Sequence, residues 1–184
     1  MEIETFCPAS RQEWRDWLMK NHDLKQSVWL VQYKKSSGIP SLTWSESVDE
    51  ALCFGWIDSV RKPIDHEKFI QFFSRRKPKG TWSKINKEKI KQLIDANLMT
   101  QAGFESIEKA KQNGSWTILD EVEELTIPPD LVAAFKNQPK AEEYFLSLSK
   151  SAKKILLHSL VFAKRPETRE NRINKIIGLA VQNS

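Results

Sequence analysis

The sequence predicts an α+β protein: a small, mostly antiparallel three-stranded sheet packed with helices, followed by a C-terminal all-helical unit. Three short segments rich in β-branched and aromatic residues indicate the strands. Apolar residues at helical spacing behind capping residues indicate the helices. All seven tryptophans fall within the first 116 of the 184 residues, so the two parts of the chain differ in composition.

The strands are predicted at residues 28–35, 56–62 and 69–74. Pro63 and Asp65 lie between the last two segments, and both residue types favour turns. We therefore expect these two strands to pair as a hairpin. The pattern does not place the first strand in the sheet.

Capping patterns mark the helices of the first part. Thr43-Trp44-Ser45-Glu46 has the spacing of a capping box, and Gly55 sits where a left-handed cap would end that helix. Ser10 begins an earlier helix in the same way. Ser83 and Thr100 are expected to cap two further helices, the second with Phe104 directed inward.

The composition changes after Trp116, where an acidic run at residues 120–124 precedes Pro128-Pro129. This change predicts a boundary between a Trp-rich α+β body, residues 1–118, and a helical unit, residues 119–184. We expect the two to pack as one compact protein. One helix of the second unit is expected from Pro129, with Leu131, Val132 and Phe135 inward; others are expected over 149–163 and from Pro166.

Several functional classes lose support. No segment has the roughly 20 apolar residues that span a bilayer, and Met1–Thr5 lacks an apolar signal core, so a cytoplasmic protein is expected. Cys7 and Cys53 are too few for a disulfide framework. The histidines are scattered and the glycines form no phosphate loop, so neither a metal site nor a cofactor is predicted.

The net charge of +5 is concentrated in one segment. Residues 75–91 contain eight Lys or Arg and one acid, a local charge of +7, so the rest of the chain sums to −2. Such a segment either binds an anionic partner or is a solvated basic face, and the sequence leaves both interpretations open.

Candidate site residues cluster around this segment. Trp56 and Asp58 should share one side of a strand by alternation, and an acid there needs a partner such as a neighbouring arginine. The basic segment and these strand residues together predict a basic-aromatic cleft. Its aromatic rings could stack on a flat group of a ligand, and its arginines could bind an anion. Its wall would comprise Trp56, Asp58, Arg61, Arg75, Arg76, Trp82 and Asn86.

Motifs along nearly the whole chain resemble the bacterial YdeI/OmpD-associated, or bacteriocin-protection, family. They include residues 51–58 (ALCFGWID), residues 73–79 (FSRRKPK), residues 102–104 (AGF) and residues 163–169 (AKRPETR). Ser59 departs from the glycine expected after the aspartate. The resemblance implies stress and antimicrobial-peptide phenotypes and a porin association, and it implies no reaction, cofactor or catalytic residue.

The leading hypothesis is a cytoplasmic binding protein whose cleft takes an anionic small molecule or an acidic peptide. Asp58 would hold an arginine in place and Trp82 would stack on the ligand. One alternative is sequence-independent binding of nucleic acid by the same cations. Another is an enzyme that uses Asp58 or Cys53, although Cys53 at a helix C-terminus reads better as a buried structural thiol. A structural adaptor without a small-molecule site is the remaining alternative.

Overall fold

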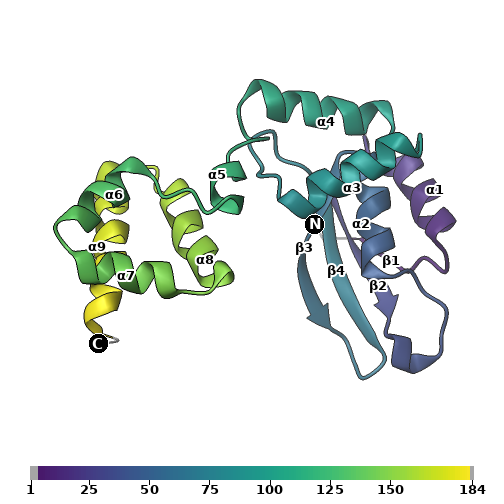
Figure 1. Ribbon diagram of the computed structural model, residues 1–184. Helices are drawn as coiled ribbons and strands as arrows, with labels where there is room; N and C mark the ends of the chain where they lie inside the picture. Colours follow the sequence, from purple (N-terminus) through teal and green to yellow (C-terminus); the bar gives the residue numbers. More distant parts are fainter. Residues whose placement is uncertain (1–3, 183–184) are drawn as a thin grey trace. The chain divides into compact units, whose positions relative to one another are not determined.

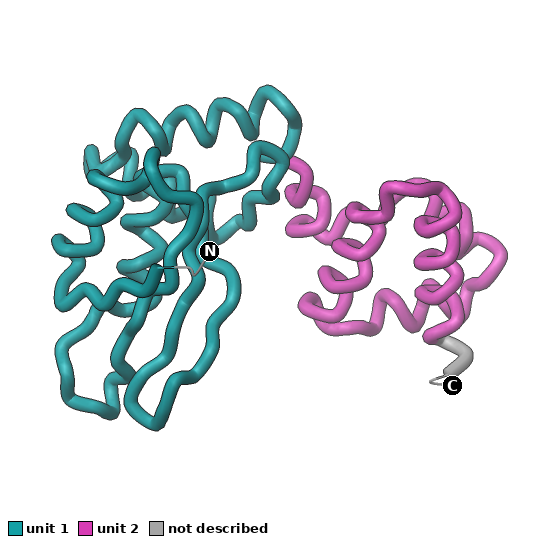
Figure 2. Tube along the Cα trace, turned by 180° about the vertical axis from the view of Figure 1, so that it is seen from behind, with its two compact units in different colours: residues 1–116 teal, residues 117–184 magenta. Residues whose placement is uncertain are grey.

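A computed structural model describes residues 4–182 (Figure 1). Its chain forms two compact units, residues 1–116 and residues 117–184 (Figure 2). Residues 1–3, on which the expected absence of a signal segment partly rests, lie outside the described residues. Within residues 4–182, no helix combines the length and the apolar character needed to cross a bilayer.

Unit 1, residues 1–116, combines strands and helices along the chain. Its elements in order are β1 (Thr5–Phe6), α1 (Arg11–Asn21), β2 (Ser27–Tyr33), a short 3₁₀ helix (Lys35–Ser37), α2 (Trp44–Cys53), β3 (Trp56–Pro63), β4 (Lys68–Arg75), α3 (Lys84–Asp95) and α4 (Gln101–Gln112).

The sheet has four strands in the order β1-β2-β4-β3. The predicted hairpin is confirmed: β3 and β4 pair antiparallel, with a bulge between Asp58 and Arg61. β2 pairs antiparallel with β4, which places the first predicted strand beside the hairpin. The prediction of three strands was wrong by one, because β1 adds a two-residue parallel edge next to β2. Two residues are too short to leave a periodic signal in the sequence.

One face of the sheet supports the core of unit 1. Val28 and Leu30 of β2 and Phe73 of β4 are fully buried there, and α1 and α2 lie over this face (Figure 1). Trp14 of α1 packs its ring 5.4 Å from that of Phe73, and Trp17 lies edge-on to Trp56 at 5.8 Å. Burial of these large rings supplies much of the unit's apolar stabilisation.

A carboxylate joins the two helices over this face. Glu50 of α2 is only 2% exposed and accepts bonds from Arg11 Nε at 2.5 Å and Arg15 Nη1 at 2.6 Å, both on α1. Arg15 also donates to the carbonyl of Leu98. This paired charge therefore connects α1, α2 and the loop before α4.

Helix α4 crosses the end of α2 at very close range. A Cβ built on Gly103 would lie 2.4 Å from the Cys53 carbonyl oxygen, so only glycine allows this approach. Thr100 stands at the N-cap of α4, as expected, but its hydroxyl donates to the Cys53 carbonyl at 2.6 Å instead of capping the helix. Gly55 has φ +71° and faces the Ala102 carbonyl, so the chain turns sharply from α2 into β3 beneath α4.

Unit 2, residues 117–184, is helical over its described part. Its helices are α5 (Asp120–Glu123), α6 (Pro129–Lys136), α7 (Pro139–Ser147), α8 (Lys150–Val161) and α9 (Pro166–Gln182). Leu131 and Phe135 are buried as predicted. Arg169 of α9 binds the Asp130 carboxylate of α6 through two nitrogens, which lowers the pKa of Asp130.

Two predicted core positions were wrong. Phe104 and Val132 are each 40% exposed, whereas Ile107 and Leu131 in the same helices are buried. Each helix buries a narrower stripe than its apolar residues cover, so a position at the margin of the stripe faces solvent.

Candidate functional site

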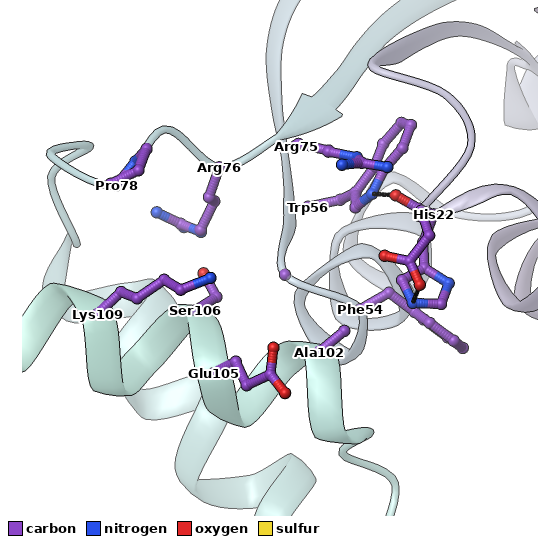
Figure 3. Close-up of a pocket in the computed structure, with 12 residues that line it drawn as sticks. His22, Phe54, Trp56, Arg75, Arg76, Pro78, Ala102, Glu105, Ser106 and Lys109 are labelled. Carbon is purple, nitrogen blue, oxygen red and sulfur yellow. Dashed lines mark hydrogen bonds and ion pairs between the residues drawn. The ribbon is translucent and has the colours of Figure 1, made fainter.

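The region where β3 begins and β4 ends is hollowed beside α4 (Figure 3). The cavity has a volume of about 220 Å³. Its wall takes residues from the end of β4, from the turn between α2 and β3, from the loop after α1, and from one side of α4. This volume suits a small ligand, because drug-sized pockets start at roughly 300 Å³.

Two consecutive arginines at the end of β4 dominate this cavity. The Arg76 side chain extends toward Ser106 and Lys109 of α4, and the Arg75 guanidinium lies beside Trp56 (Figure 3). Their backbones are fixed because Arg75 N donates to the Gln26 carbonyl and Arg76 N to the Gly55 carbonyl. The sheet and the tight turn at Gly55 therefore set where both guanidinium groups emerge.

Each guanidinium is only partly satisfied by the protein. Arg75 Nε donates to the Lys25 carbonyl at 2.9 Å, and Arg76 Nη1 donates to the Thr81 carbonyl at 3.1 Å. Arg75 Nη2, Arg76 Nε and Arg76 Nη2 are buried and have no hydrogen-bond acceptor among the described residues. Buried donors without acceptors are costly and rare, so this is a strained polar arrangement.

Arg76 also lacks an ion-pair partner among residues 4–182. Its guanidinium carbon lies 3.5 Å from the centroid of the Trp82 ring, a cation–π contact. Burial lowers the pKa of Arg76 to about 9, and only the more distant charge of Asp58 opposes this shift. The group still carries its charge near pH 7, so the site holds a buried cation without an anion beside it.

The remaining charged groups of the wall have both signs. Lys109 adds a third cation, whereas Asp23 and Glu105 add two carboxylates. Asp23 lies 3.3 Å from the His22 imidazole. Arg75 and Arg76 lie on the β4 side, whereas α4 presents both Glu105 and Lys109 (Figure 3), so the cavity is polar and carries charges of both signs.

The structure brings together three of the predicted site residues. Trp56, Arg75 and Arg76 line the cavity. Trp82 does not line the cavity. Its ring is 2% exposed and covers the Arg76 guanidinium, whereas we expected this ring to stack on a ligand. Asp58, Arg61 and Asn86 do not contribute to its wall.

Asp58 has other partners than the expected arginine. Its carboxylate accepts bonds from Trp44 Nε1 at 2.8 Å and from Gln71 Nε2 at 3.2 Å. Arg61 lies over the Phe69 ring at 3.7 Å. The expected Asp58–arginine ion pair is therefore replaced by hydrogen bonds to neutral groups, since the bulge after Asp58 changes the direction of the strand.

Sequence reasoning missed the contribution of α4. Ser106 and Lys109 belong to a helix whose distance from Arg76 along the chain hides their proximity. The glycines at positions 55 and 103 were the sequence features that could have indicated this proximity, because their lack of a side chain lets α4 approach the end of α2. His22 and Asp23 were likewise missed because the loop after α1 reaches the cavity only in the fold.

The thiol of Cys53 is unsuited to nucleophilic chemistry. It is fully buried, and burial together with the charge of Glu50 raises its pKa to about 11. A thiol with so high a pKa holds almost no thiolate at neutral pH. Within residues 4–182, no three His, Cys, Asp or Glu side chains gather in a way that could hold a metal ion.

Thiol labelling should distinguish the two cysteines. With Ellman's reagent at pH 8, we expect one rapidly reacting thiol per native chain, the exposed Cys7, and two after denaturation. Cys7→Ser should remove the rapid phase and leave a slow one that follows unfolding. Equal, rapid reaction of both thiols in the native protein would contradict the burial of Cys53.

Comparisons with known proteins match both parts of the chain. Residues 6–106, more than half of the 184, match a family model described as a domain of unknown function (DUF8412). Residues 124–183 match the model described as bacteriocin-protection, YdeI or OmpD-associated. No curated protein and no solved structure matched the sequence.

Proposed function

The chain belongs to the bacteriocin-protection, YdeI or OmpD-associated family through residues 124–183 and to a family of unknown function through residues 6–106, and from this premise we propose that unit 1 is a binding module for a small oxyanion. The ligand would be inorganic phosphate, or a small molecule carrying a phosphate or carboxylate group, held by Arg75 and Arg76.

The observation that carries the proposal is that Arg75 and Arg76 both line the cavity while their guanidinium groups are only partly hydrogen-bonded. Arg75 Nη2, Arg76 Nε and Arg76 Nη2 are buried without acceptors among the described residues. An oxyanion supplies several acceptors and a negative charge at once, and guanidinium binds phosphate and carboxylate in a forked geometry. Such a ligand would satisfy the donors and neutralise the buried charge of Arg76.

The acids of the wall restrict the choice of ligand. Asp23 and Glu105 oppose a large or highly charged anion and would favour a positive group on the other end of the ligand. The volume of about 220 Å³ sets a similar limit on size. A small, singly or doubly charged oxyanion therefore fits better than a polymer at this site.

Isothermal titration calorimetry with inorganic phosphate at constant ionic strength tests the proposal. We expect saturable binding, and Arg76→Lys should weaken it at least about tenfold, because a hydrogen bond to a charged group contributes about 1.5–3 kcal/mol and lysine lacks the guanidinium fork. Arg75→Lys should weaken it as well. Thermal unfolding of each variant verifies that the fold is intact.

Arg61→Ala is the matched control. Arg61 is an exposed arginine of the same sheet that lies on Phe69 and not in the cavity, so its removal should leave phosphate binding unchanged. Absence of saturable phosphate binding by the native chain would overturn the proposal. Equal losses in Arg61→Ala and Arg76→Lys would do the same, because they would show that the loss does not depend on the position of the arginine in the cavity.

A further inference from the structure

The second face of the sheet in unit 1 presents aromatic side chains. Alternation directs Trp29, Val31 and Tyr33 of β2 and Ile70 and Phe72 of β4 to the side opposite the buried core. We refer to these five residues as the open sheet face. All five are half-buried, whereas α1 and α2 lie on the other side of the sheet (Figure 1).

Two of its rings contact each other edge-on, and we refer to this pair as the platform. Trp29 and Phe72 are paired directly across β2 and β4, their ring centroids are 4.9 Å apart, and their planes are inclined at 63°. The Lys62 ammonium lies 5.1 Å from the Trp29 ring centroid, which shows that a cationic group can reach the outer side of that ring. The platform therefore joins an aromatic surface to a positive charge.

The strands that form this face carry few acidic residues. β2 and β4 contain no Asp or Glu, and the one acid of β3, Asp58, is bonded to Trp44 and Gln71. Lys68 pairs with Asp65 at 3.7 Å, at the hairpin end. Lys62 and the exposed Lys77 have no acidic partner in the part of the chain that the structure describes.

A hollow lies at one end of the platform. It is lined by Ile57, Phe72 and Ser74 of the sheet, by Lys77, Gly80 and Thr81 of the loop after β4, and also by Arg75 and Arg76. Its volume is about 670 Å³, within the range that accepts a group as large as a nucleobase. The hollow continues from an aromatic ring to a lysine.

We propose that the open sheet face binds single-stranded nucleic acid. Unpaired bases would stack on Trp29 and Phe72, while Lys62 and Lys77 would contact phosphates. Flat rings on a sheet with cations at the border can use the exposed faces of unpaired bases, which a duplex keeps stacked. Arg75 and Arg76 line both the hollow and the oxyanion cavity, but this inference depends on the Trp29 and Phe72 rings and on Lys62, which do not line the oxyanion cavity.

Fluorescence anisotropy of a labelled oligothymidylate with the full chain at low salt tests the proposal. Base–aromatic stacking contributes enough that Trp29→Leu should weaken binding at least about fivefold, whereas Trp29→Phe should retain most of it. Phe72→Leu provides a second ring variant. With two lysines on phosphates, log affinity should fall with log salt at a slope near about −1.4, and Lys62→Ala should reduce that slope by about 0.7.

Matched controls separate stacking from charge. Phe104→Leu removes an exposed ring on α4, and Lys91→Ala removes an exposed lysine on α3; both variants should bind as the native chain does. Heparin and duplex DNA should compete more weakly than unlabelled oligothymidylate. The proposal would be overturned if the chain did not bind the oligothymidylate. It would also be overturned if heparin competed as well as unlabelled oligothymidylate and the ring variants bound as the native chain does. Neither outcome would affect the phosphate result.

Discussion

Gly103→Ala is expected to lower the free energy of unfolding of unit 1 by about 3 kcal/mol. The added Cβ would lie 2.4 Å from the carbonyl oxygen and 2.9 Å from the carbonyl carbon of Cys53, and these backbone atoms cannot turn aside. Helix α4 would have to move away from the end of α2, which would weaken the bonds from Thr100 to the same carbonyl. The gain of roughly 1 kcal/mol in helix propensity does not offset this strain.

Urea unfolding followed by tryptophan fluorescence measures this effect, because all seven tryptophans lie in unit 1. Gly178→Ala in α9 is the matched control: a Cβ there would meet no atom within 4 Å, so we expect unchanged or slightly increased stability of unit 2, followed by circular dichroism. A Gly103→Ala chain as stable as the native one would contradict the close approach of α4.

Glu50→Ala should have an effect of similar size for an electrostatic reason. The carboxylate is 2% exposed and is the shared partner of Arg11 and Arg15. Its removal would leave Arg15, whose side chain is 20% exposed, with a carbonyl as its remaining hydrogen-bond partner. Breaking a buried pair from one side costs about 3–5 kcal/mol, and the partial exposure of both arginines favours the lower end.

The same urea assay checks this expectation. Glu108→Ala is the control, because Glu108 forms an exposed pair with Lys111 on α4 and such pairs contribute about 0.5 kcal/mol or less. Glu50→Gln should recover part of the loss, since the amide still offers an oxygen to one arginine. A Glu50→Ala chain that unfolds like Glu108→Ala would show that the pair is not needed to join α1 to α2.

Local patterns predicted most of the elements of unit 1. The hairpin of β3 and β4 followed from two apolar segments around a turn, and the helix from Thr43 followed from a capping box that the structure contains. The missing strand, β1, consists of two residues and exists only because β2 provides a free edge. Helix α7 was not predicted either, since its nine residues span too few turns to show a clear helical period.

The site was only partly accessible to sequence reasoning. Arg75 and Arg76 were identified from charge, but their unsatisfied donors depend on how the loop to Trp82 folds over them. The platform of Trp29 and Phe72 depends on the pairing of β2 with β4, which the pattern left open. The division at residues 118 and 119 stays a prediction; the two buried clusters of the fold lie on either side of it.

The bulge in β3 has a consequence for the behaviour of the protein in concentrated solution. β3 is an outer strand of the sheet, and unpaired backbone groups on such a strand can recruit another chain into an intermolecular sheet. Here the bulge interrupts the strand after Asp58, and Arg61, Lys62 and Pro63 follow it. Like charges repel an approaching copy and proline offers no N–H, so this border resists the strand-to-strand association that leads to aggregation.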